Sequence, residues 1–151
     1  MEFDKDKAIA LLNKIMELEL AGVVRYTHYA LMVFGYNRLP IIGWLSAQAD
    51  EGLLHARRAG ELITHFGGHP SLGIGPLLES HTHDIGNILR ESLEHEKAAK
   101  SVYYELFELV QGKSVLLEEY ARELIVEEEM HVGEVDKMLR APGDIGVFAK
   151  G

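Results

Sequence analysis

The chain has 151 residues, enough to bury a substantial hydrophobic core, and we expect one domain over residues 1–151. Hydrophobic residues make up 47% and charged residues 26%, which excludes a mainly disordered chain. The net charge of −9 disfavours binding to nucleic acid and suits attraction of cations. The absence of cysteine excludes disulfides, thiolate metal sites, iron–sulfur clusters and thiol catalysis, and leaves eight histidines as the softest metal ligands.

No apolar run in the sequence approaches the ~18 to 20 residues that a membrane span needs. The first residues, Met1-Glu2-Phe3-Asp4-Lys5-Asp6, are charged and lack the apolar stretch of a signal peptide. We therefore expect a cytoplasmic protein with neither a membrane nor a nucleic acid as partner.

Four segments are rich in Leu, Ala, Glu, Lys and Arg, which favour helix, and glycine and proline separate them. They cover about residues 5–34, 40–66, 80–111 and 115–140. No segment alternates apolar and polar residues as a strand would. The sequence thus predicts an all-α chain with a helical core over about 5–140 and a short tail over 141–151.

The lengths of the connections predict the topology. The first and third connections are short, so each joins antiparallel neighbours. The middle connection has about 13 residues and is rich in glycine and proline. Fully extended, it reaches ~43 Å at ~3.3 Å per residue, as far as a helix of ~27 residues, which is ~40 Å long. We therefore expect an up-down-down-up four-helix bundle with a long crossover between helices 2 and 3.

Each predicted helix carries an apolar stripe that polar side chains interrupt near mid-length. These residues are Glu19 in the first helix, His55 in the second, Glu96 in the third, and Glu128 and His131 in the fourth. No Lys or Arg lies on the stripes, and an unpaired buried carboxylate costs several kcal/mol. Each residue alone has an ordinary explanation, such as a stripe misassigned by one position, a hydrogen-bonded core histidine or a solvated glutamate run. Their coincidence at similar depth favours a bound metal.

Several short motifs carry a family resemblance over about residues 8–140. They are Asn13-Lys14, Glu19-Leu20-Ala21 with Tyr26, Gly68-His69-Pro70-Ser71-Leu72, Ile88-Leu89-Arg90 leading to Glu96, and Glu128-Glu129-Met130-His131. A Glu from each of two helices with Glu-x-x-His motifs from the others is the di-iron carboxylate arrangement. The chain resembles the bacterioferritins of the ferritin-like family.

The resemblance implies a set of metal ligands. Glu19 and Glu96 correspond to ligands from the first and third helices, Glu128 to a bridging ligand and His131 to an imidazole ligand. His55, with Glu51, would supply the ligands of the second helix, and Tyr26 occupies the position of a tyrosine close to the metals. Such a site suits two iron ions, with manganese or zinc as possible substitutes.

The second helix departs from the family pattern. Glu51 precedes His55 by four residues instead of three, and Gly52 stands at the expected glutamate position. We predict a single π-turn at Gly52 that absorbs the extra residue and returns Glu51 to the metals; the alternative is a straight helix with Glu51 turned aside. This helix also lacks the methionine that binds the family's haem, so we expect no haem. The tail is too short for the family's full fifth helix, which leaves assembly into a shell open.

The resemblance implies a protein that oxidises Fe(II) with dioxygen or hydrogen peroxide, for iron storage or detoxification, and that forms a homo-oligomer, either a dimer or a shell. Two alternatives remain open: a rubrerythrin-like di-iron peroxidase, and a non-catalytic bundle whose polar core sets helix pairing. The other histidines are expected outside the site. His28 is interpreted as packing and His95 as lying off the stripes. The run His81-Thr82-His83-Asp84 is interpreted as helix capping and solvated residues, with a surface metal or entry site as the alternative.

Overall fold

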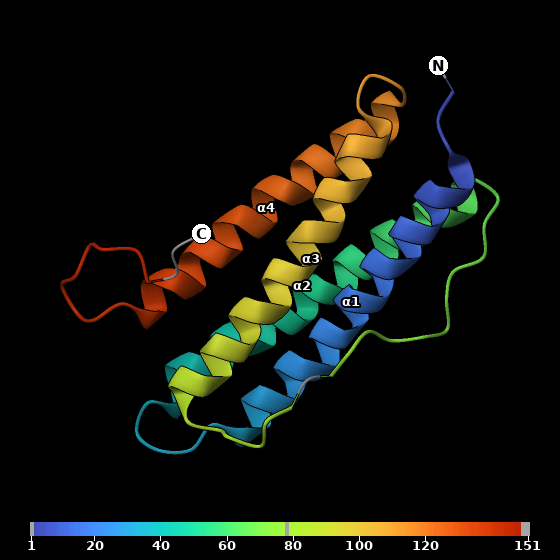
Figure 1. The fold of residues 1–151 in the computed structure, drawn as a ribbon. Coiled ribbons are helices and arrows are strands. Elements are labelled where there is room, and N and C mark those ends of the chain that lie inside the picture. The colour runs from blue at the N-terminus through green and yellow to red at the C-terminus, as the bar shows by residue number, and fades with distance from the viewer. Residues whose placement is uncertain (1, 78, 149–151) are drawn as a thin grey trace.

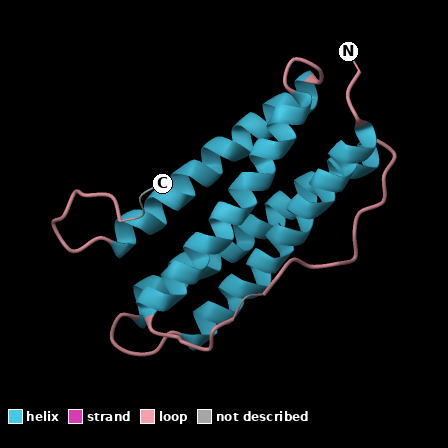
Figure 2. Ribbon diagram, in the orientation of Figure 1, coloured by secondary structure: helices cyan, strands magenta, loops and turns pink. Residues whose placement is uncertain are grey.

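Four long helices and no strand make up the described part of the chain, which in this computed structural model covers residues 2–77 and 79–148 (Figure 2). Helix α1 spans Lys5–Met32, α2 spans Arg38–His65, α3 spans Ile85–Val110 and α4 spans Val115–Leu139. The predicted all-α class is confirmed. None of these helices is both long enough and apolar enough for a membrane span, as far as the described residues go.

Side-chain caps define three of the four helix starts. Asp4, Asp84 and Ser114 each accept a hydrogen bond from the backbone N–H three residues further on, at α1, α3 and α4. The third helix was predicted to begin near residue 80, and this was wrong. His81 has a left-handed backbone, with φ of 58°, and the helix begins only after the Asp84 cap.

The predicted topology is confirmed. In Figure 1, α2 and α3 run in the same direction, and the connection between them passes along α1 for the length of the bundle. Hydrogen bonds fix this crossover to α1: the Asn13 side chain donates to the His69 carbonyl at 3.1 Å and accepts from the Ser71 N–H at 2.7 Å. Further along, the Gly75 N–H donates to the Glu17 carbonyl at 2.9 Å.

The apolar core is divided along the bundle. The largest cluster, which includes Leu12, Ile15, Leu106 and Leu124, lies towards the α3–α4 turn. Smaller clusters, around Tyr29, Val33 and Leu45 and around Leu89, Leu93 and Val135, lie towards the opposite end. Between these apolar regions the four helices bury polar side chains: Glu19, His55, Glu96 and Glu128.

Candidate metal centre

One small cavity at mid-length of the bundle is lined by all six predicted metal ligands. Its volume is about 10 Å³. The lining residues come from all four helices: Glu19, Gly22, Tyr26, Gln48, Glu51, Gly52, His55, Glu96, Glu128 and His131. Three of its carboxylates and one imidazole are buried, with exposed fractions of 7% for Glu19 and His55, 6% for Glu96 and 3% for Glu128.

Glu19, His55 and Glu128 form the first group of potential ligands. His55 Nδ1 lies 3.5 Å from Glu19 Oε2, and one ligand atom from each of the three residues lies within 4.8 Å of the others. The second oxygen of Glu19 accepts a hydrogen bond of 2.9 Å from the hydroxyl of Tyr103. Small movements would place these atoms at the ~2.0 to 2.2 Å that nitrogen and oxygen ligands keep from a zinc-sized ion.

Glu96 and His131 form the second group, with Tyr26 beside them. His131 Nε2 lies 3.8 Å from Glu96 Oε1, and the Tyr26 hydroxyl donates to the same oxygen at 2.7 Å. The Tyr26 oxygen is also 3.4 Å from His131 Nε2. Tyr26 thus contacts both potential ligands of this group.

The buried carboxyl groups of the site differ in the direction of their pKa shifts. Burial, with repulsion from Glu96, raises the pKa of Glu128 to about 12. Burial acts on Glu96 in the same way, but the hydrogen bond from Glu128 and the charges of His131 and His95 hold its pKa below the ordinary value. Burial also raises the pKa of Glu19. In His55 burial is outweighed by the neighbouring Glu19, so the imidazole pKa is raised.

Glu128 Oε2 is the atom that best fits a cation. It is buried and has no hydrogen-bond partner among the described residues. A buried polar atom without a partner costs about 1–3 kcal/mol, and more when it is charged. No Lys or Arg stands among the described residues that line the cavity. Glutamate oxygens and imidazole nitrogens are ligands that iron, manganese and zinc all accept, so the residues present fit a pair of such ions.

The predicted π-turn at Gly52 was wrong, because α2 is an uninterrupted α-helix through this region. Gly52 is buried against α1, and a Cβ there would lie 3.2 Å from the Glu19 carbonyl oxygen. The close approach of α1 therefore occupies the space that a larger side chain would need. Glu51 lies one helical turn before His55 and shares its face. Its half-exposed carboxylate is 3.7 Å from His55 Nε2, at the rim of the cavity.

Glu127 is a neighbour of the site that sequence reasoning missed, because it was grouped with a solvated run. Its Oε2 lies 3.2 Å from His55 Nε2, and Glu51, His55 and Glu127 form a second set of mutually close ligand atoms. The spacing of four residues between Glu127 and His131 was the available signal, since residues at i and i+4 share a helix face.

His95 also differs from expectation. It was predicted to lie off the core stripes, but it is only 6% exposed and packs against Gly22, where a Cβ would lie 3.1 Å from its Nε2. Burial lowers the pKa of His95, which favours the neutral imidazole. Glycine at position 22 leaves room for this ring between α1 and α3.

Comparisons with known proteins agree with this architecture. The structure is similar to a ferritin-like di-iron carboxylate protein of Bacillus anthracis, with a TM-score of 0.86 and 22% identity over 93% of this chain and 100% of the other. It is similar to a dodecameric thioferritin, the bacterioferritin-related protein of Bacteroides fragilis (TM-score 0.84, 23% identity, 91% and 86% of the two chains). It is also similar to Rhodobacter capsulatus bacterioferritin, described with a metal-free dinuclear site and a haem iron (TM-score 0.81, 21% identity, 92% and 86%).

At sequence identities of 21–23%, the similarity to these solved structures establishes only that the fold is shared. No curated protein matches the chain. The model of the ferritin-like domain matches residues 9–142, which is most of the sequence. The chain therefore belongs to the ferritin-like domain family.

Proposed function

We propose that this protein binds two iron ions in the mid-bundle cavity and oxidises Fe(II) to Fe(III) with dioxygen or hydrogen peroxide. The observation that carries the proposal is the convergence of three buried glutamates and two histidines from four helices on one cavity. Manganese or zinc could occupy the same ligands. No haem is part of the proposal.

The proposed roles follow from the contacts. Glu19 with His55 would hold one ion, and Glu96 with His131 the other. Glu128 is close to both groups: it lies within ligand distance of Glu19 and His55 and forms a hydrogen bond with Glu96. It would therefore bridge the two ions. Tyr103 and Tyr26 orient Glu19 and Glu96 through their hydroxyls.

The negative charge of the site would favour the oxidised product. Carboxylates stabilise Fe(III) over Fe(II) by their negative charge. Two Fe(II) ions supply two electrons, which with two protons reduce dioxygen to hydrogen peroxide or peroxide to two water molecules. The proton that Glu128 holds must leave when a cation binds, so metal affinity should weaken at low pH.

A surface pocket between α2 and α4 gives Fe(II) a route to the site. It shares Gln48, Glu51 and His131 with the central cavity, and Glu127 and Glu134 add further carboxylates. Negative groups around an opening raise the local concentration of cations.

Metal analysis and Fe(II) oxidation together test the proposal. Iron bound per chain is measured under anaerobic conditions, and Fe(III) formation is then followed by near-ultraviolet absorbance after addition of dioxygen or peroxide. Glu19→Ala and Glu128→Ala should abolish rapid oxidation, while Glu119→Gln, exposed on α4 away from both pockets, should retain it. Oxidation by peroxide alone would favour a rubrerythrin-like peroxidase, and a stable chain that binds no metal would favour a non-catalytic bundle.

Iron storage, as distinct from iron oxidation, would require a shell of subunits. One of the similar solved structures is described as dodecameric, and we propose that this chain also forms a homo-oligomer. Light scattering coupled to size exclusion measures the mass directly. A shell would support storage, whereas a dimer would restrict the function to oxidation.

A further inference from the structure

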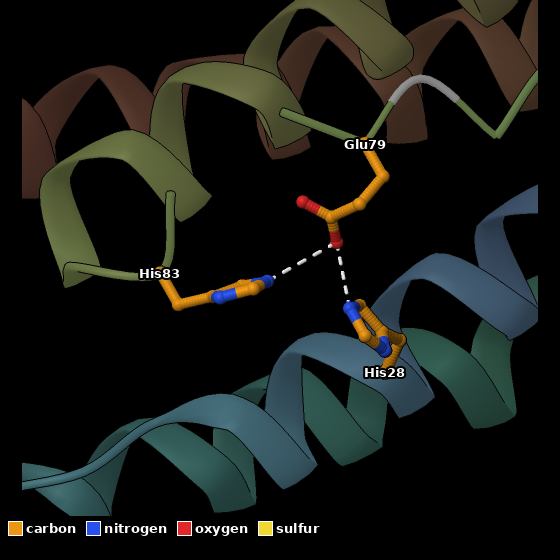
Figure 3. A group of neighbouring side chains, drawn as sticks. All are labelled: His28, Glu79 and His83. Carbon is orange, nitrogen blue, oxygen red and sulfur yellow. Dashed lines mark ion pairs between the residues drawn. The ribbon is translucent and has the colours of Figure 1, made fainter. Parts of the chain in front are cut away.

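A second cluster of metal-ligating side chains lies outside the central cavity, where the crossover ends. His28 projects from the outer side of α1, and Glu79 and His83 come from the segment that leads into α3 (Figure 3). Both imidazoles face the same carboxylate oxygen: His28 Nε2 is 2.6 Å and His83 Nε2 is 3.3 Å from Glu79 Oε2. One ligand atom from each residue lies within 4.8 Å of the other two.

The three facing atoms are buried, and apart from their contacts with one another none has a hydrogen-bond partner among the described residues. The residues themselves are partly exposed, with 41% of the His28 side chain, 19% of Glu79 and 18% of His83 accessible. Solvent can therefore reach the cluster, although its ligand atoms point inward. Burial opposes ionisation of Glu79, but the His81 N–H and the two imidazoles hold its carboxyl pKa below the ordinary value.

Neighbouring contacts hold this segment in place. The second oxygen of Glu79 accepts a hydrogen bond of 2.6 Å from the His81 N–H, which fixes the carboxylate. Glu91 of α3 accepts from the Ser80 N–H at 2.9 Å and from the Tyr29 hydroxyl at 2.7 Å, and so ties the segment to α1. The three ligands therefore come together on a backbone that other residues position.

We propose that His28, Glu79 and His83 bind one divalent transition-metal ion, independently of the central site. Two imidazoles and one carboxylate form a ligand set that Zn²⁺ and Fe²⁺ accept, with remaining positions for water. Ligands ~2.0 to 2.1 Å from a tetrahedral ion are about 3.3 Å apart. The His83–Glu79 pair already has this separation, and the His28–Glu79 pair, at 2.6 Å, needs to widen by about 0.7 Å.

An ion at this position would connect the end of the crossover to α1. Because the unfolded chain does not hold the three ligands together, binding stabilises the folded state by mass action. Binding should slow the local opening of segment 79–83 more than it slows global unfolding, because this segment cannot move away from α1 until the ion is released. The bound ion would thus hold the end of the long connection against α1.

Zn²⁺ titration of the metal-free protein tests the proposal. In the background His55→Ala/Glu128→Ala, which removes a ligand from both central sets of close ligand atoms, calorimetry should detect one Zn²⁺ per chain. His28→Ala or His83→Ala in that background should weaken this binding by at least about tenfold. His81→Asn is the matched control: it removes an imidazole from the same segment, and asparagine tolerates the left-handed backbone. His81→Asn should keep the site.

Hydrogen exchange supplies a second readout. Zn²⁺ should slow amide exchange in residues 79–83 of the wild-type chain and have no such effect in His28→Ala. If the background variant does not fold, the stoichiometry of His28→Ala in the otherwise wild-type chain must fall by one ion. Undiminished Zn²⁺ binding in His28→Ala and His83→Ala, or equal loss in His81→Asn, would overturn the assignment.

Discussion

Replacing Glu128 with glutamine should stabilise the metal-free protein near neutral pH. Burial and Glu96 raise the pKa of Glu128 from its ordinary 4.5 to about 12, so folding at pH 7 must add a proton that the unfolded chain lacks. Each pH unit above 4.5 costs about 1.4 kcal/mol, which amounts to about 3 kcal/mol at pH 7. Glutamine carries no such penalty, and its amide can donate to Glu96 as the protonated carboxyl does.

The pH dependence distinguishes this effect from a packing change. Because the native state binds the proton more tightly, the contribution of Glu128 to stability is fully present below pH 4.5 and is lost progressively as the pH rises from 4.5 towards about 12. Chemical denaturation of EDTA-treated protein should therefore show an advantage for Glu128→Gln of about 3 kcal/mol at pH 7, with a melting temperature higher by about 6 to 12 °C, and a far smaller advantage near pH 5. Glu134→Gln, exposed on the same helix, is the control. Equal stability of Glu128→Gln and wild type at pH 7 would refute the reasoning.

Three further predictions concern the surroundings of the central cavity. Gly52→Ala places a Cβ 3.2 Å from the backbone carbonyl oxygen of Glu19, so urea denaturation should show none of the ~1 kcal/mol gain that Gly→Ala brings inside an unobstructed helix. Tyr26→Phe removes the 2.7 Å hydrogen bond to Glu96, and competition with a metal indicator should show affinity reduced by about 10- to 100-fold. Glu51→Gln or Glu127→Gln alone should retain two bound ions, whereas the double variant should lose one by elemental analysis, since both carboxylates face His55.

The fold could be predicted because it follows from the local helix-forming composition of four segments and from the lengths of the connections between them. Four segments of helix-forming residues, two short connections and one long one permit few arrangements. The error at the start of α3 also has a local cause. Asp84 is an ordinary cap, but the left-handed backbone of His81 depends on contacts of the crossover with other parts of the chain, including its N–H bond to Glu79.

The residues of the candidate site could be predicted where they lie on apolar stripes. Glu19, Glu96 and Glu128 stand out because a carboxylate on a core stripe needs compensation. Glu127 does not lie on the core stripe, and its only local signal is the four-residue spacing to His131; its proximity to His55 depends on the distance between α2 and α4. The same holds for His28 and His83, which only the path of the crossover brings together.

The glycine at position 52 accounts for the way charge is distributed around the proposed di-metal site. Two divalent ions carry four positive charges, and Glu19, Glu96 and Glu128 supply three negative ones. A glutamate at position 52 would place its Cβ 3.2 Å from the Glu19 carbonyl oxygen, so α1 and α2 would have to move apart by a few tenths of an ångström to admit it. Glu51 and Glu127 are the remaining carboxylates near His55, and both are partly exposed at the side facing the surface pocket. The fourth charge would therefore come from the rim, on the side of the surface pocket that we propose as the Fe(II) route. A ligand in that position would bind an incoming ion and then contribute to holding it.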